Sequence, residues 1–166
     1  PWSIGGGGAA ELKVLIDQEA SEKLANAIDE IGSGVVTRED EAYLIGFMPA
    51  LRKKVDESHI RQIVEGEAVR DWTLYEIKSA IWPYNDETLK AEENRALLRF
   101  LWPMRAYLAK RVAYGLSQLD RGLTWYEYSM FFRERYRIHF SIVYGEVATH
   151  NHFVLDRGGK VFNRTA

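Results

Sequence analysis

The sequence predicts an α+β fold, with a helical first two-thirds and a small, mostly antiparallel β unit near the C-terminus. Windows in which apolar residues recur every three or four positions predict the helices. Runs of β-branched and aromatic residues between positions 138 and 163, separated by Gly145 and by an Asp-Arg-Gly-Gly-Lys turn, predict the β unit. With 166 residues, the chain is long enough for one medium-sized domain or for two small ones.

The N-terminal segment predicts a helix after a flexible entry. Apolar residues such as Leu12, Leu15 and Ile16 form one stripe along residues 9–31, and Gly32 and Gly34 end the pattern. The four glycines at 5–8 lack the Gly-Lys-Ser/Thr and the preceding strand of a phosphate-binding loop. We therefore expect two parts: a Gly-rich entry with an N-terminal helix over residues 1–34, and an α+β domain over residues 35–166.

The middle of the chain combines short strands with two helices. Strand patterns cover residues 42–48, stopped by Pro49, and 74–81, while 59–64 is short and alternating. A helical pattern covers residues 87–102, and Pro103 suits the first position of a second helix over 103–114. On that helix Arg105, Lys110 and Arg111 are expected on the polar side.

Composition excludes several classes of protein. Cysteine is absent, which excludes disulfides and cysteine metal sites, and no run approaches the roughly 20 apolar residues of a membrane span. The first residues lack the features of a secretory signal, so we expect a cytoplasmic location. Residues 101–166 hold ten Lys and Arg against five Asp and Glu, a net +5, whereas residues 1–100 have a net −7. This asymmetry favours a polyanion-facing surface in the last third, with scattered solvated charge as the alternative.

Two groups of residues in the last third suggest binding chemistry. Arg133, Arg135 and Arg137 alternate, so in an extended chain they would share one face and could follow a phosphate backbone. The alternative is a solvated surface paired with Glu127 and Glu134. Trp125 precedes this basic, aromatic segment and is a candidate for base stacking, and Glu127 could accept from a cytosine amine or hold Arg133 or Arg135 in place. The other four tryptophans are expected as core or interface anchors: Trp2, Trp72, Trp82 and Trp102.

The histidines of the β unit permit a metal hypothesis. His150 and His152 would share one strand face, and Asp156 or Glu146 would have to supply a third ligand. DNA contact or a hydrogen-bonded structural turn are the competing interpretations.

At these residues the sequence resembles the specificity region of adenine-N6 DNA methyltransferases of the Eco57I type, which include restriction–modification enzymes and the methyltransferase of BREX phage defence. The resemblance covers about residues 35–166. Matching segments, in the family's order, are 39–48, the Gly-acidic-x-aliphatic-Arg turn within 64–72, 82–84, 98–111, the Trp-Tyr-Glu motif at 125–127, and 149–163, which resembles the BREX subgroup most closely.

The departures from the family pattern are equally informative. The Asn/Asp-Pro-Pro-Tyr/Phe motif that holds the target amine is missing, as is a Gly-rich loop after a strand for S-adenosylmethionine. The resemblance therefore implies the part that finds and orients DNA, inactive alone, with the catalytic core upstream and S-adenosylmethionine bound by the parent protein, not by this fragment. Implied partners are double-stranded DNA, that upstream core and other defence-system subunits, with no membrane.

The resemblance and the residue pattern together predict a set of nucleic-acid-binding residues. They are Trp125, Tyr126, Glu127, Arg133, Arg135, Arg137, His150, Asn151, His152, Arg157, Lys160 and Arg164. Two other classes remain as alternatives. One is a helical protein–protein interaction module, and the other is a small metallo-hydrolase built on His150, His152 and Asp156.

Overall fold

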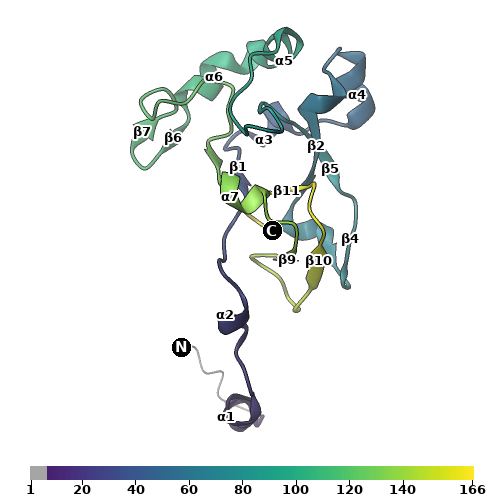
Figure 1. Ribbon diagram of the computed structural model, residues 1–166, viewed down its shortest axis with the longest axis vertical. Coiled ribbons are helices and arrows are strands. Elements are labelled where there is room, and N and C mark those ends of the chain that lie inside the picture. Colours follow the sequence, from purple (N-terminus) through teal and green to yellow (C-terminus); the bar gives the residue numbers. More distant parts are fainter. Residues whose placement is uncertain (1–6) are drawn as a thin grey trace. The chain divides into compact units, whose positions relative to one another are not determined.

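The computed structural model describes residues 7–166, which form two compact units with a boundary between Gly32 and Ser33 (Figure 1). Gly5 and Gly6 of the predicted flexible entry lie outside the described residues, as does Trp2. Gly7 and Gly8 have φ angles of 62° and 79°, and Gly8 directly precedes the first helix.

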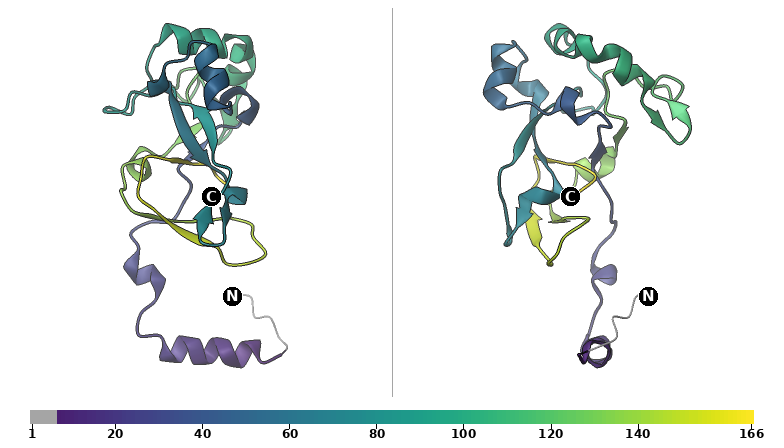
Figure 2. Two further views of the ribbon diagram at one scale, coloured as in Figure 1. Left: turned by 90° about the vertical axis from the view of Figure 1, so that its right-hand side faces the viewer. Right: turned by 180° about the vertical axis from the view of Figure 1, so that it is seen from behind.

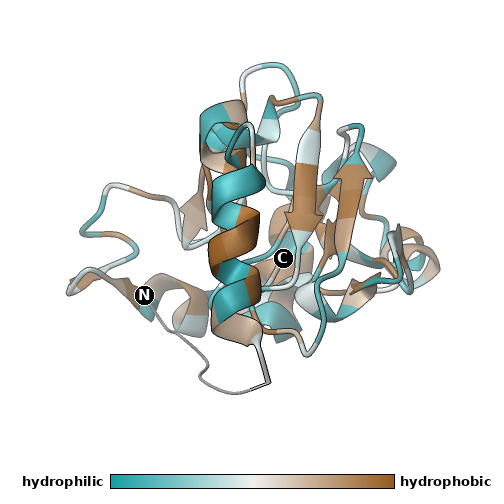
Figure 3. Cartoon of the chain, turned by 90° about the horizontal axis from the view of Figure 1, so that it is seen from below, coloured by the Kyte–Doolittle hydropathy of each residue, from teal (hydrophilic) through white to brown (hydrophobic). Residues whose placement is uncertain are grey.

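The first unit contains two short helices instead of the single helix predicted over residues 9–31. They are α1 (Ala9–Glu19) and α2 (Leu24–Ala27). Along α1 hydrophobic and hydrophilic residues alternate (Figure 3), yet none of its side chains is buried. Isolated helices of this length are marginal in water, and a helix with no buried side chain has no packing to extend it. The apolar stripe therefore predicts where the helix begins, but the helix ends at Glu19 and not at residue 31.

The second unit is organised around a three-stranded sheet in the order β11-β2-β5. Its strands are β2 (Ile60–Val64), β5 (Lys78–Ile81) and β11 (Val161–Phe162). β5 runs antiparallel to β2, whereas β11 lies parallel to β2, with Val161 opposite Ile63. Nearby, β1 (Val35–Val36) pairs with β8 (Met130–Phe131), and Val35 bridges to Asn163. Segments from both ends of the unit thus meet at one place.

This topology overturns the predicted division into a helical first two-thirds and a C-terminal β unit. Five of the strands, β1 to β5, precede residue 82, and the sheets are small and dispersed. The last strand joins β2 and not its sequence neighbours. Sequence periodicity reports which residues are extended, but strand partners depend on tertiary packing that local pattern does not encode.

Several element predictions also change. Residues 42–48 form no strand: α3 (Asp40–Tyr43) is followed by α4 (Phe47–Arg52), with Pro49 in its first turn, where proline is tolerated. The helix expected from residue 87 begins late, as α5 (Arg95–Leu101). The Asn94 side-chain oxygen accepts from the amides of Ala96 and Leu97 and so fixes that start.

The predicted second helix is likewise shorter. After η3 (Trp102–Met104), α6 (Arg105–Lys110) ends before a hairpin of β6 (Val112–Ala113) and β7 (Leu116–Ser117). Tyr114 and Gly115 form the turn, both with positive φ. Arg111, expected on a polar face, is instead buried, and its guanidinium lies 5.4 Å from the centre of the Tyr43 ring.

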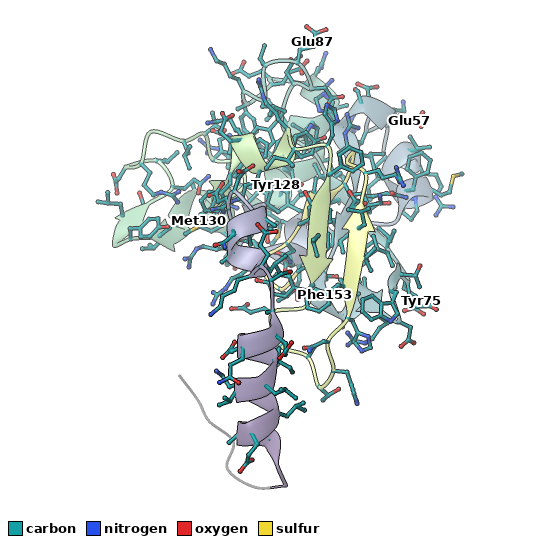
Figure 4. All side chains as sticks on the ribbon, turned by 60° about the horizontal axis from the view of Figure 1, so that its bottom comes forward. Glu57, Tyr75, Glu87, Tyr128, Met130 and Phe153 are labelled. Atoms are coloured by element: carbon teal, nitrogen blue, oxygen red, sulfur yellow. The ribbon has the colours of Figure 1, made fainter. Side chains whose placement is uncertain are left out.

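The main core is rich in aromatic rings. Trp82, Tyr84 and Tyr128 are almost completely buried and meet edge to face, with ring centres 4.9 to 6.0 Å apart. The Tyr128 hydroxyl donates to the Ile81 carbonyl at 2.5 Å, and the Tyr128 amide donates to the Tyr84 hydroxyl (Figure 4 labels Tyr128). Of the tryptophans predicted as core or interface anchors, Trp82 is buried in the core, whereas Trp72 and Trp102 are mainly exposed.

Two hairpins complete the unit and pack together (Figure 2). One joins β3 (Val69–Arg70) to β4 (Thr73–Leu74), and the other joins β9 (Ser141–Tyr144) to β10 (Phe153–Asp156). A second core cluster of Val64, Ala68, Val69 and Val143 lies between them. The remaining elements are η1 (Glu57–His59), η2 (Gly66–Ala68) and α7 (Arg133–Tyr136). None of the helices in residues 7–166 combines the length and hydrophobicity that a membrane crossing requires.

Candidate nucleic-acid interface

The β9–β10 hairpin presents the loop that carries three of the predicted binding residues, His150, Asn151 and His152. The strands are antiparallel, with Val143 opposite Val154 and Tyr144 opposite Phe153. Val143 and Val154 face the second core cluster, while Ile142 and Leu155 are about half exposed on the other face. The inner face therefore anchors the hairpin and leaves residues 145–152 as a surface loop.

A close backbone junction fixes one end of this loop. A Cβ atom on Gly66 would lie 2.1 Å from the Thr165 carbonyl oxygen, so only glycine fits there. The Gly66 amide donates to the Thr165 hydroxyl at 2.9 Å, and the Glu146 amide donates to the Thr165 carbonyl at 2.8 Å. Gly145 also lies against Gly66. The loop thus leaves β9 from a defined point.

The three predicted binding residues of the loop differ in their surroundings. His152 is half-buried, and its Nδ1 atom accepts from the Asp71 amide at 3.1 Å, which ties the loop to the β3–β4 turn. His150 is exposed, with Nδ1 3.0 Å from the Thr149 hydroxyl, and Asn151 is also exposed. His150 and Asn151 are therefore available to a ligand, whereas His152 has a structural contact.

The turn after β10 separates Arg157 from Lys160. Asp156 is buried and accepts from the Gly158 amide at 2.8 Å and from the Lys160 ammonium at 2.5 Å. Lys160 therefore stabilises the turn. Arg157 is exposed, with its guanidinium 5.9 Å from the centre of the Phe140 ring. Arg164 is exposed as well, 4.0 Å from the Glu146 carboxylate.

The three alternating arginines do not lie along an extended strand, because residues 133–136 form helix α7. Residues two apart on a helix point in different directions. Arg133 donates to the Leu89 carbonyl at 2.8 Å and Arg135 to the Ser33 carbonyl at 2.8 Å, while the exposed Arg137 reaches the Glu87 carbonyl only at 3.5 Å. The basis for a continuous phosphate-contacting row, a shared strand face, is therefore absent.

The Trp-Tyr-Glu motif is mostly internal. The Glu127 carboxylate is buried and accepts from the Thr124 amide and hydroxyl at 2.7 and 3.0 Å, with Arg133 at 3.8 Å. Burial raises the pKa of Tyr126. This geometry favours the structural role considered for Glu127 over base reading, because its acceptor oxygens already have partners.

Trp125 is the partly exposed member of the motif, and it also packs against the main core. Its ring lies 6.0 Å from that of Trp102, and the Arg105 guanidinium lies 5.0 Å and 5.9 Å from the centres of the Trp102 and Trp125 rings. Sequence reasoning missed Trp102 and Arg105 as companions of Trp125. The signal available in the sequence was Pro103, which lies between these two residues, where α5 passes into the 3-10 helix η3.

Residues 7–166 contain no group of three His, Asp or Glu side chains arranged to hold a metal ion. His150 and His152 lie with ring centres 6.0 Å apart, but Asp156 is occupied by Gly158 and Lys160. A pocket of about 260 Å³ lies elsewhere, beside Glu65, Glu67 and Glu76. Its acidic lining does not suit a DNA phosphate.

No protein-family model matches the chain. The chain is 28% identical, over 169 aligned residues, to the adenine-specific methyltransferase PglX of Streptomyces coelicolor. The alignment covers the whole chain but only 14% of that protein's length. This similarity supports a relationship between the chain and a segment of an adenine-specific methyltransferase.

Proposed function

We propose that the chain is a DNA-contacting, target-recognition segment of a site-specific adenine-N6 methyltransferase of a phage-defence system, of the Eco57I type and closest to the BREX subgroup. Residues 35–166 would form the recognition part. One observation carries the proposal: the whole chain aligns with a segment that makes up 14% of an adenine-specific methyltransferase. The chain also lacks the Asn/Asp-Pro-Pro-Tyr/Phe motif that holds the target amine. A segment of this kind binds and orients DNA, while the S-adenosylmethionine site and the chemistry lie elsewhere in a cytoplasmic parent protein.

Exposed cationic and amide side chains support the DNA-contacting role. His150, Asn151, Arg157 and Arg164 are exposed near or within the β9–β10 hairpin, and Arg137 is exposed after α7. Arginines at such positions neutralise phosphates and release counterions, and these contacts fix the position of the protein along the duplex. Amide and imidazole groups can contact base edges. Buried or paired members of the predicted set, such as Glu127 and Lys160, would instead shape the surface.

Salt-dependent DNA binding by the intact methyltransferase tests this proposal. Arg157→Ala with Arg164→Ala should weaken binding and lower the slope of log K against log salt by about one per lost phosphate contact. The pair Arg133→Ala with Arg137→Ala tests the α7 region in the same way. Arg52→Ala is the matched control, because Arg52 is an exposed helical arginine outside the proposed surface. Unchanged affinity and slope in both double variants would overturn the DNA-contacting role.

The first unit favours a second, protein-binding role. Leu12, Leu15 and Ile16 form one stripe on α1 and are 54–58% exposed. A helix this short gains stability when such a stripe packs against another protein surface. If replacing all three residues with Ser abolished assembly with other parts of the methyltransferase while DNA binding by the second unit persisted, this unit would be an interaction module.

A further inference from the structure

The turn between β3 and β4 holds a tryptophan in an unfavourable backbone conformation. Arg70 pairs with Thr73, so Asp71 and Trp72 alone form the loop, with φ angles of 47° and 65°. Two-residue hairpin loops with both central φ angles positive prefer Asn-Gly or Asp-Gly, because glycine adopts this conformation without a steric penalty. Asp71 fits that preference, but a bulky aromatic residue at the second position is strained.

Packing does not compensate for this strain. The Trp72 side chain is 70% exposed, and its ring lies 6.3 Å from that of Phe153. Phe153 is in turn 6.0 Å from Tyr144, so three aromatic rings follow one another across the β3–β4 turn and the outer face of the β9–β10 hairpin (Figure 4 labels Phe153). Strained residues that bury little surface are typical of ligand-contacting positions.

The same turn is fixed to the predicted binding loop. His152 accepts the Asp71 amide hydrogen at 3.1 Å, and its imidazole lies between the turn and His150, whose ring is 6.0 Å away. The exposed donors His150 and Asn151 therefore lie within the same surface region as Trp72. The part of the chain that contributes this loop, residues 101–166, has a net charge of +5.

From this arrangement we infer that Trp72 stacks against a DNA base, with Phe153 and Tyr144 extending the aromatic surface. The inference rests on the proposed function and adds a residue that the sequence assigned to the core or an interface. Aromatic side chains stack on bases of any sequence, and apolar side chains at protruding turns insert between base steps. The exposed hydrogen-bonding side chains of His150 and Asn151 in the adjacent loop favour a nucleic acid over a protein partner, because such groups can contact base edges beside a stacked ring.

Replacing Trp72 with glycine separates binding from folding. Trp72→Gly creates the preferred Asp-Gly turn, so hydrogen exchange of the intact methyltransferase should show equal or greater protection of amides 69–75. Affinity for a duplex containing the methylated site should nevertheless fall about five- to hundredfold, as expected for the loss of one stacking contact. The slope of log K against log salt should not change, because no cation is removed. Trp72→Phe should restore part of the affinity.

Tyr114→Gly is the matched control. Tyr114 is 82% exposed at positive φ in the two-residue β6–β7 turn, which Figures 1 and 2 place away from the β9–β10 hairpin. Its replacement should leave DNA affinity unchanged. In a duplex carrying 2-aminopurine near the methylated site, wild type should quench the fluorescence of at least one position, and Trp72→Gly should not.

Two outcomes overturn the inference. One is unchanged affinity of Trp72→Gly while the Arg157 and Arg164 variants still weaken binding; that result would retain DNA contact and assign Trp72 to a protein-facing surface. The other is an equal loss of DNA affinity in Tyr114→Gly, which would show that replacing any exposed aromatic residue in a hairpin turn weakens binding. If the arginine variants also bind normally, the proposed function itself fails, so the two failures are distinguishable.

Discussion

Arg111 donates a 2.6 Å hydrogen bond from its Nη2 atom to the backbone carbonyl oxygen of Glu127. The same buried guanidinium donates to the carbonyls of Thr37 at 2.5 Å and Leu108 at 2.9 Å. Two segments distant in sequence, around Thr37 and Glu127, thus converge with the end of α6 on one cation whose hydrogen-bond partners are neutral carbonyl groups. The fixed fork of the guanidinium suits this task, because it presents several donors in one plane.

Arg111→Ala should destabilise the chain by about 3 kcal/mol, because several buried carbonyl oxygens lose their donors together. Arg111→Lys should recover only part of this, since an ammonium cannot span the same acceptors. Urea unfolding measures both. Lys110→Ala, at the exposed neighbouring position, should change stability by no more than about 0.5 kcal/mol. Equal effects at positions 110 and 111 would contradict the role of Arg111.

Gly66→Ala should destabilise the second unit by about 2 kcal/mol or more, because the new methyl group would overlap the Thr165 carbonyl. Gly145→Ala should cost less, since the nearest atom, the Gly66 carbonyl oxygen, lies 3.2 Å from the added carbon. Denaturant midpoints of the two variants give the comparison. A milder effect at Gly66 than at Gly145 would show that the junction is not closely packed.

Asn94→Ala should cost about 1 kcal/mol, because the helix α5 loses the side-chain acceptor for two of its first amides. Asn94→Asp should retain only part of the stability, since aspartate caps equally well but replaces the amide that donates to the Asp56 carboxylate at 2.9 Å. Thermal unfolding followed by far-ultraviolet circular dichroism measures the difference. If alanine and aspartate behaved alike, capping by Asn94 would not contribute to stability.

Stability should fall in alkaline solution. Burial raises the pKa of Tyr43, Tyr84 and Tyr128, whereas in the unfolded chain these phenols ionise near their ordinary value of about 10. Stabilisation is therefore complete below about pH 10 and is lost as the pH rises through the native pKa values. Each tyrosine contributes a slope of up to about 1.4 kcal/mol per pH unit.

Urea midpoints measured across this pH range, with tyrosinate absorbance followed in parallel, test the expectation. Tyr43→Phe should reduce the alkaline slope by the share of one tyrosine. A midpoint that stayed constant between about pH 9 and 11 would contradict native pKa values above those of the unfolded chain.

Local features of the fold were predictable, and the pairing of its elements was not. Strands form in three ranges that the pattern predicts as extended, because alternating and β-branched patterns are short-range signals: Ile60–Val64, Ser141–Tyr144 and Phe153–Asp156. His59 instead ends η1, and residues 138–140 lie outside β9. The parallel partner of β2 comes from residues 161–162, and only tertiary packing selects it. Asn94 interrupts a helical pattern whose apolar spacing is otherwise regular, because its side-chain oxygen accepts from the amides of Ala96 and Leu97 and starts the helix there.

The types of residue in the candidate site were predictable from the sequence, but which of their side chains are exposed was not. Trp72 was assigned to the core or an interface, because tryptophan is usually largely buried, and positive φ at a non-glycine turn residue has no sequence signature. Glu127 and Lys160 matched a binding pattern, yet nearby backbone and side-chain groups occupy them. Charge and aromatic content indicate a binding surface, whereas which members face solvent depends on the turns.

The parallel placement of β11 beside β2 has a consequence for biosynthesis. Until Val161 and Phe162 leave the ribosome, β2 has an open edge with unpaired amide and carbonyl groups, adjacent to an apolar core. Such an edge can pair with other nascent chains, and long-range pairings of this kind form slowly. The sheet can close only once residues 161–162 have been translated, about 100 residues after β2, so chaperone binding during translation should favour ribosome-bound chains that expose residues 60–64.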